Sequence, residues 1–217
     1  MSTLDFYNMA GAPGSLAVIM TAKAVGVELN SINVNTTKNE HLKPEFVKIN
    51  PQRTVPTLVD NGFVVWETRA IVVYLVEKYG KPDSSLYPKD PQIRAVINQR
   101  MYFDMGTLYD AFDKYYFYIL RNGKEETEEN LEKLNAAFKL LNTFLEGQDY
   151  VAGSQMSVAD FVIFATVLVI RVVDFDLKEF PNVDRWFTNV QNVPLAWAQD
   201  LRVLCDVKKF LCSNLKK

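Results

Sequence analysis

The stretch "TVPTLVDNGFVVWETRA", residues 54–70, carries the strongest signal for the fold. Asn61-Gly62 lies between two runs rich in β-branched residues, a pattern typical of a tight hairpin between antiparallel strands. A helical pattern begins directly after the hairpin and ends at Gly80. We therefore predict two antiparallel strands followed by an amphipathic helix over residues 67–81.

Upstream of this stretch, strand and helix patterns alternate. Residues 3–8 and 28–34 read as strands, a helical pattern covers residues 15–26 between them, and a short helix is predicted over residues 41–50. A strand, a helix and a second strand form a right-handed parallel crossover. Together with the hairpin, the order β-α-β-α-β-β-α predicts a thioredoxin-like domain with a mixed sheet, here without a Cys-x-x-Cys motif.

Downstream, residues 82–90 are rich in Pro, Ser and charged residues, as interdomain linkers are. Every later pattern is helical, over residues 92–123, 126–147, 157–173, 183–192 and 195–211. Residues 157–173 are apolar nearly all round and predict a buried central helix, with Ser157 and Asp160 spaced as in a capping box. We expect an α/β domain over residues 1–81, the linker, and an all-α domain over residues 91–217.

Composition limits the classes of function. Hydrophobic residues make up 48% of the chain, enough for a sizeable core, and a net charge of −2 argues against a nucleic-acid partner. One histidine and two cysteines make a metal site unexpected. Cys205 and Cys212 would lie about 10.5 Å apart along a helix, too far for a disulfide, so we expect reduced thiols and a cytoplasmic location.

The chain shows no signal-peptide pattern at its beginning. Its longest apolar run, residues 161–170, is too short to span a bilayer. We therefore expect neither a membrane anchor nor a membrane partner.

Four stretches resemble cytosolic glutathione S-transferases of the insect delta class, and the resemblance extends over the whole chain. They are residues 40–81, "NQRMYFDMGTLY" (98–109), "LNTFLEGQDYVAG" (141–153) and "SVADF" (157–161). The resemblance implies a homodimer that conjugates glutathione, as co-substrate and without another cofactor, to electrophilic apolar compounds. A non-catalytic protein that binds glutathione or apolar ligands, and a structural protein comparable to the lens crystallins of this family, stay open as alternatives.

The resemblance also assigns residues to glutathione. Val55-Pro56 would be a cis peptide that leaves the Val55 N–H and C=O for the ligand's backbone. Thr68 and Glu67 lie at the predicted start of a helix, where N–H groups favour a carboxylate. Glu67 suits the ammonium group on the same carbon of the γ-glutamyl end, and Arg69 can add a counter-charge.

The glycine end of glutathione would be held by two further residues. His41 matches a family position that reaches this end. Arg53 stands where delta enzymes carry a histidine, and its guanidinium can bind a carboxylate through two N–H groups. An ordinary surface role remains open for both residues.

A series of large side chains at helical spacing suggests the site for the second substrate. Stripes of this kind are usually core or dimer interface, but the resemblance places this helix in one wall of the apolar site. We expect that site to be lined by members of the set Met105, Tyr109, Phe112, Tyr116 and Phe117.

The catalytic hydroxyl is missing from its usual place. Delta enzymes carry a serine in a pattern like Pro-Gly-Ser-x-Pro-Cys-Arg-Ser, and aligning it without gaps to residues 10–17 places Ala12 at the serine. Three hypotheses follow: Ser15 supplies the hydroxyl; Asn8 or the N–H groups at the helix start polarise the thiol; or the protein binds glutathione without catalysing.

Overall fold

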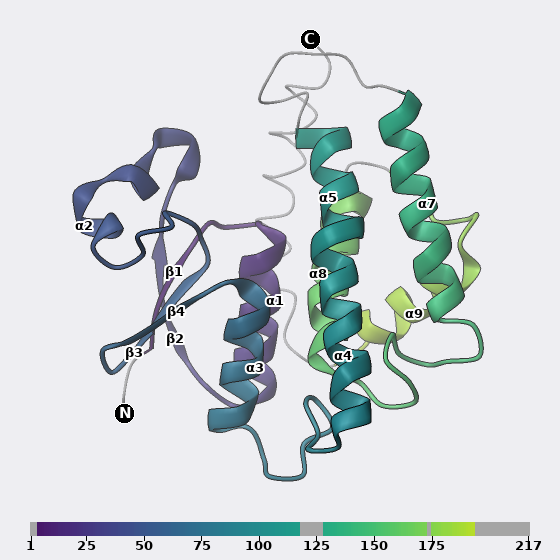
Figure 1. The fold of residues 1–217 in the computed structure, drawn as a ribbon, viewed down its shortest axis with the longest axis horizontal. Coiled ribbons are helices and arrows are strands. Elements are labelled where there is room, and N and C mark those ends of the chain that lie inside the picture. The colour runs from purple at the N-terminus through teal and green to yellow at the C-terminus, as the bar shows by residue number, and fades with distance from the viewer. Residues whose placement is uncertain (1–3, 118–127, 173–174, 194–217) are drawn as a thin grey trace.

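The computed structural model describes residues 4–117, 128–172 and 175–193, which form a sheet covered by helices and an adjoining helical domain (Figure 1). The helix predicted over residues 195–211, with Cys205 and Cys212, lies outside the described residues. No helix within the described ranges combines the length and the apolar character that crossing a membrane requires.

The N-terminal domain contains a four-stranded sheet in the order β2-β1-β3-β4. Its strands are β1 (Leu4–Asn8), β2 (Leu29–Asn33), β3 (Thr57–Asp60) and β4 (Phe63–Trp66). β1 pairs in parallel with β2 and antiparallel with β3, and β3 pairs antiparallel with β4. Both residues of the Asn61-Gly62 turn have positive φ, as a tight hairpin turn requires. The thioredoxin-like arrangement is confirmed.

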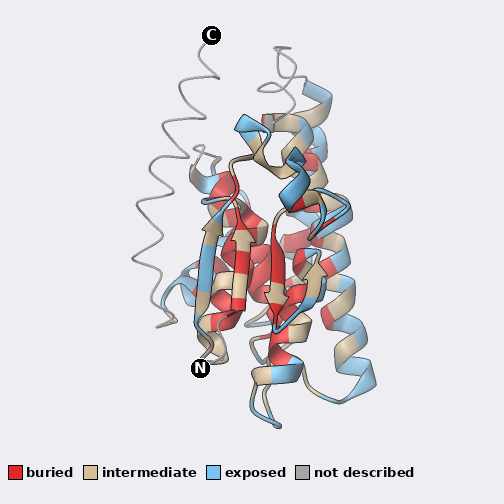
Figure 2. Cartoon of the chain, turned by 90° about the vertical axis from the view of Figure 1, so that its left-hand side faces the viewer, coloured by how far each residue is buried: buried red, intermediate tan, exposed pale blue. Residues whose placement is uncertain are grey.

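Two helices separate this sheet from the helical domain. They are α1 (Pro13–Ala24) and α3 (Thr68–Tyr79), and Figure 1 shows both between the strands and the helices of the second domain. The short α2 (Pro44–Val47) lies beyond the sheet, after two 3-10 turns, η1 (Thr36–Lys38) and η2 (Glu40–Leu42). Figure 2 shows that burial concentrates in the two central strands and in the helices behind them.

The helical domain begins after a connection that runs from the end of α3 to Pro91. Its helices are α4 (Pro91–Phe103), α5 (Tyr109–Phe112), α7 (Glu128–Phe144), α8 (Val158–Val172) and α9 (Pro181–Gln191). The sequence predicted one helix over residues 92–123. The described part of that range is helical, but two π-helical stretches, η3 (Asp104–Leu108) and η4 (Asp113–Phe117), interrupt its α-helical spacing.

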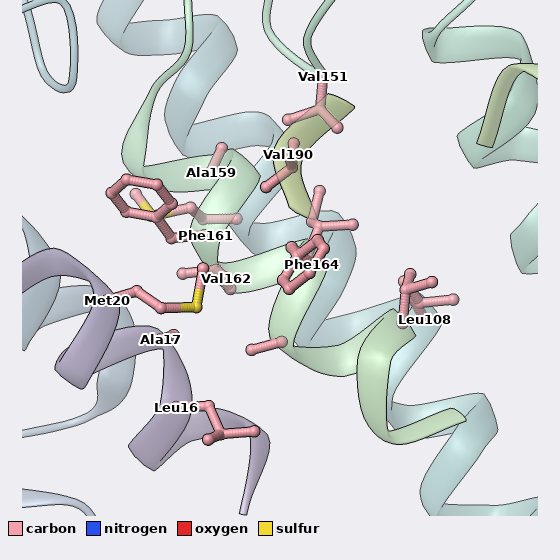
Figure 3. Close-up of a cluster of buried hydrophobic side chains, with 14 of the residues drawn as sticks. Leu16, Ala17, Met20, Leu108, Val151, Ala159, Phe161, Val162, Phe164 and Val190 are labelled. Atoms are coloured by element: carbon pink, nitrogen blue, oxygen red, sulfur yellow. The ribbon is translucent and has the colours of Figure 1, made fainter. Parts of the chain in front are cut away.

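The centre of the molecule is the contact between α1 and α8. Figure 3 shows Leu16, Ala17 and Met20 of α1 facing the side of α8 that carries Val162. α8 is buried along almost its whole length, as its apolar sequence predicted. Because α1 also packs on the sheet, its position is fixed from two sides.

Asp160 anchors the start of α8. Its Oδ2 accepts hydrogen bonds from the N–H and hydroxyl of Ser157, and its Oδ1 accepts from the Val151 N–H and the Trp186 Nε1–H, at 2.8–3.1 Å. Burial raises the pKa of Asp160, and these hydrogen bonds oppose that shift. The predicted capping-box spacing is confirmed as a structural anchor.

Candidate ligand-binding site

A cavity of about 200 Å³ lies where the two domains meet. Three segments of the N-terminal domain line it: the start of α1, the loop before β3 and the start of α3. The helical domain closes the other side. The lining residues are Ala12, Pro13, Gly14, Ala17, Thr54, Val55, Pro56, Glu67, Thr68, Arg69, Asp104, Tyr109, Val162 and Thr166.

The loop before β3 is held by one buried amide. Asn50 Nδ2 donates to the Thr54 carbonyl and to the Thr57 hydroxyl, both at 2.9 Å, and Asn50 Oδ1 accepts from the Gln52 N–H. The Val55-Pro56 peptide is cis, which confirms that prediction. Among the described residues the Val55 N–H and C=O have no hydrogen-bond partner, so both are available to an extended ligand.

The start of α3 presents a hydroxyl and a carboxylate. Glu67 is exposed and precedes the helix with φ of 71°, whereas Thr68, the first helical residue, is buried against the cavity. Gln52 donates to Glu67 Oε1 at 2.9 Å and accepts from the Trp66 indole N–H at 2.8 Å. This chain of hydrogen bonds fixes the Glu67 carboxylate beside the unpaired N–H groups of the helix.

Arg69 reaches across the cavity to the helical domain. Its Nη2 donates to Oδ2 of Asp104, which is fully buried at the first position of η3. Burial raises the pKa of Asp104, and the charge of Arg69 and the hydroxyl of Thr166 oppose that shift. Arg69 therefore already has a partner and contributes to the cavity wall as half of an ion pair.

The start of α1 supplies backbone donors without a side-chain hydroxyl. Ala12 precedes the helix and makes no side-chain cap, and Pro13 has no N–H. The first hydrogen bond of the helix runs from the Leu16 N–H to the Ala12 carbonyl, so the N–H groups of Gly14 and Ser15 have no partner within α1. This end of the helix can therefore stabilise a negatively charged sulfur.

Neither side chain considered as a substitute for the serine lines the cavity. Ser15 is 1% exposed, and among the described residues its Oγ has no hydrogen-bond partner. Asn8 is also buried, and its amide donates to the Phe6 carbonyl and to the Ser31 hydroxyl. The geometry thus favours the backbone N–H groups over Ser15 and Asn8 as donors to a thiol.

Of the four predicted apolar-site residues whose side chains the structure describes, only Tyr109 lies in the lining of this cavity. Met105 is 46% exposed on the outer surface, and Phe112 and Tyr116 belong to the core. The side chain of Phe117 lies outside the described residues.

The π-helical stretch η3 explains this arrangement. The Tyr109 N–H donates to the Asp104 carbonyl, five residues earlier. Side chains five residues apart would diverge by about 140° on an α-helix, but here both residues reach the cavity.

His41 and Arg53 are not in the cavity lining. His41 is the middle residue of η2, and its buried Nδ1 has no hydrogen-bond partner among the described residues. Arg53 is exposed and has a left-handed φ of 61°. Their predicted contact with a glycine carboxylate stays a prediction.

Sequence reasoning missed Gln52, Asp104 and Thr166. Asp104 had a visible signal, since it is a carboxylate in a stripe with Met101 and Leu108, and all three are buried. Gln52 and Thr166 had none, because their partners are distant in sequence. Among the residues that the structure describes, no group of three His, Cys, Asp or Glu side chains is placed to hold a metal ion.

Comparisons with known proteins agree with this geometry. The family models "Glutathione S-transferase, N-terminal domain" and "Glutathione S-transferase, C-terminal domain" match residues 2–77 and 101–194. Glutathione S-transferase D6 of Drosophila melanogaster is 68% identical over 98% of each chain, and D7 of the same species is 63% identical over 97% of this chain and 94% of the relative. A Nilaparvata lugens delta-class glutathione transferase, 40% identical, superimposes with a TM-score of 0.93 and covers 97% of this chain and 99% of its own.

Proposed function

This chain belongs to the delta class of the glutathione S-transferase family, and from that membership we infer that it binds glutathione and conjugates it to electrophilic apolar compounds. The single observation that supports this function best is the cavity itself. It combines the unpaired backbone of Val55 with the starts of two helices. That combination suits a peptide whose one end carries a carboxylate and whose middle carries a thiol.

We assign the γ-glutamyl end of glutathione to the start of α3. The Thr68 hydroxyl and the N–H groups of the helix would bind its carboxylate, while Glu67, held by Gln52, would accept from its ammonium group. The Val55 N–H and C=O would pair with the cysteinyl backbone. The thiol would then lie near the start of α1, opposite Tyr109 and Asp104 in the helical domain.

Calorimetric titration with glutathione tests this assignment. Glu67→Gln and Thr68→Ala should each weaken binding by about 1–3 kcal/mol, the usual contribution of hydrogen bonds to charged groups. Glu132→Gln is the matched control, because Glu132 is exposed on α7 and distant from the cavity lining. Unchanged affinity in both cavity variants would exclude the assignment.

Conjugation should be slow at neutral pH. A free thiol has a pKa of about 8.5, and delta enzymes lower it with the hydroxyl that Ala12 lacks. The N–H groups of Gly14 and Ser15 and the helix dipole remain, and they favour the thiolate without a side chain. We therefore propose a conjugating enzyme whose rate rises toward alkaline pH; a protein that binds glutathione but shows no conjugation above background at any pH would be the non-catalytic alternative.

We also propose a homodimer. Tyr102 and Met105 are exposed apolar side chains three residues apart, near the end of α4 and the start of η3, on a surface that a second copy of the chain would cover. Sedimentation at micromolar concentration should give about twice the chain mass, and Tyr102→Glu combined with Met105→Glu should give monomers. Leu140→Glu, at an equally exposed leucine on α7, is the control and should leave the mass unchanged. A monomeric parent chain would contradict the proposal.

A cytoplasmic location is part of the same proposal and rests on family membership. Fractionation of cells that express the chain should recover it with the soluble cytoplasmic markers. Recovery in a membrane or organelle fraction would contradict it.

A further inference from the structure

Glu67 stands at the start of α3 but does not cap it. It is the N-cap residue, with a left-handed φ of 71°, and its side chain accepts no hydrogen bond from the helix. The first hydrogen bond of α3 runs from the Ile71 N–H to the Glu67 carbonyl, so the N–H groups of residues 68–70 have no partner within the helix. Such groups attract a carboxylate. The carboxylate of Glu67 is nevertheless held away from them.

Gln52 holds the Glu67 carboxylate in this position. Its Nε2 donates to Glu67 Oε1 at 2.9 Å, and its Oε1 accepts from the Trp66 indole N–H at 2.8 Å. An indole nitrogen can only donate, and an ionised carboxylate can only accept. Only one of the two orientations of the amide satisfies both partners, so Trp66 sets the direction in which Gln52 donates.

The backbone of Gln52 is fixed by the buried Asn50. The Gln52 N–H donates to Asn50 Oδ1 at 2.9 Å, and the Arg53 N–H donates to the Asn50 carbonyl at 3.0 Å. Asn50 is 0% exposed and also donates to the hydroxyl of Thr57, the first residue of β3. The exposed side chain of Gln52 thus extends from a closed turn that is tied to the sheet, and its amide reaches the start of α3 from a fixed base.

The two charges of the γ-glutamyl end need separate partners. Its carboxylate and its ammonium group are attached to one carbon, and the proposed function assigns the first to the start of α3 and the second to Glu67. Both can bind only while the Glu67 carboxylate leaves the helix N–H groups vacant. Gln52 binds Oε1 of Glu67 and leaves Oε2 for the ammonium group.

We propose that Gln52 is a positioning residue that prevents Glu67 from capping its own helix and so keeps the start of α3 open for the carboxylate of glutathione. This inference rests on the proposed function, because it assigns both charged groups of the ligand. Without the Gln52 amide, the Glu67 carboxylate would turn to the N–H groups of residues 68–70 and compete with the ligand for them.

Gln52→Met tests this role, because methionine is similar in length but cannot donate to Glu67. Calorimetric titration should show a Kd for glutathione that is weakened by about three- to tenfold, since the lost hydrogen bond to a charged group is exposed. Without glutathione, the urea midpoint of unfolding should equal or exceed that of the parent chain, because Glu67 then caps α3. A residue that only supports the fold would lower this midpoint.

A double-mutant cycle with Glu67→Ala provides the second readout. Glu67→Ala weakens binding by itself, and adding Gln52→Met should cause no further loss, because no carboxylate remains to be positioned. Trp66→Phe removes only the N–H that orients the amide and should weaken binding by less than Gln52→Met. Gln148→Met is the matched control and should bind like the parent chain, since Gln148 is an exposed loop residue beside α9, outside the cavity lining.

Three results would overturn the proposal: parent-like affinity in Gln52→Met, a lowered urea midpoint in that variant without ligand, or losses that multiply in the double variant. Parent-like affinity in Gln52→Met beside a weakened Glu67→Ala would remove only the role of Gln52 and leave the proposed function in place. Failure of the parent chain to bind glutathione would instead count against the proposed function.

Discussion

Arg69, the second residue of α3, donates to the buried carboxylate of Asp104, the first residue of η3, and this ion pair joins the sheet domain to the helical domain at the wall of the cavity. One partner is fully buried and the other is 19% exposed. The pair is thus largely shielded from water. Removing either partner would therefore leave the other charge uncompensated, which lowers the free energy of unfolding.

Asp104→Ala should lower the free energy of unfolding by about 3–5 kcal/mol, because it leaves the Arg69 charge without its partner. Urea denaturation at one fixed protein concentration measures this. Asp110→Ala is the control, since it removes an exposed ion pair with Lys114 and should cost less than about 1 kcal/mol. Equal losses in the two variants would contradict a buried, coupled pair.

Asp60 should make stability depend on pH in the acid range. Burial alone would raise its pKa, but hydrogen bonds from Lys78, Tyr79 and Tyr74 outweigh burial and lower the pKa to about 2. A carboxyl group whose pKa is lowered by folding stabilises the protein fully above its unfolded pKa, near 4, and loses this effect as pH falls toward 2.

Asp60→Asn should therefore cost about 2 kcal/mol at neutral pH and flatten the decline in stability between about pH 4 and pH 2. Denaturation measured across this range provides the check. Asp149→Asn, at an exposed carboxylate 3.7 Å from Arg185, should keep the decline of the parent chain. A parallel decline in Asp60→Asn would show that other groups are responsible.

Restoring a hydroxyl at residue 12 should accelerate conjugation. Ala12→Ser should raise the rate at neutral pH by about ten- to a hundredfold, which corresponds to about 1.4 kcal/mol for each factor of ten, and should shift the pH–rate profile toward lower pH. Ala10→Ser adds the same group in the exposed turn before it, outside the cavity lining, and should change neither. No gain from Ala12→Ser would mean that the thiol lies elsewhere.

Removing the hydroxyl of Ser15 should leave catalysis intact. The hydroxyl is buried, lacks a partner among the described residues and is absent from the cavity lining. Ser15→Ala should keep the conjugation rate within about twofold of the parent and keep or raise stability by up to about 1 kcal/mol, because an unsatisfied buried hydroxyl is lost. A large loss of rate with unchanged glutathione affinity would reinstate Ser15 as the donor to the thiol.

The thioredoxin-like half was readable from the sequence because local chemistry determines it. The Asn61-Gly62 turn, Pro56 before β3 and the start of α3 are each specified by neighbouring residues. The contribution of the helical domain to the cavity was not readable in the same way. Asp104 meets Arg69 only after the two domains pack, so its position in a buried helical stripe signals burial but not its partner.

Of the predicted aromatic stripe, Tyr109 lines this cavity and the other described side chains do not, for a different reason. Regular α-helical spacing places Met105, Tyr109, Phe112 and Tyr116 near one face, but η3 and η4 change that spacing. Tyr109 consequently lines the cavity, Met105 is exposed and the other two enter the core. π-Helical stretches have no simple residue signature, so a periodicity argument cannot place them.

The extra residue in η3 gives the length of this segment a tolerance that its composition does not show. Deleting one residue between Asp104 and Tyr109 would place Tyr109 four residues after Asp104 and restore the ordinary helical repeat. Residues four apart share one face of an α-helix, so both side chains would still face the cavity. This turn can therefore gain or lose a residue without turning the rest of the helix away from the site.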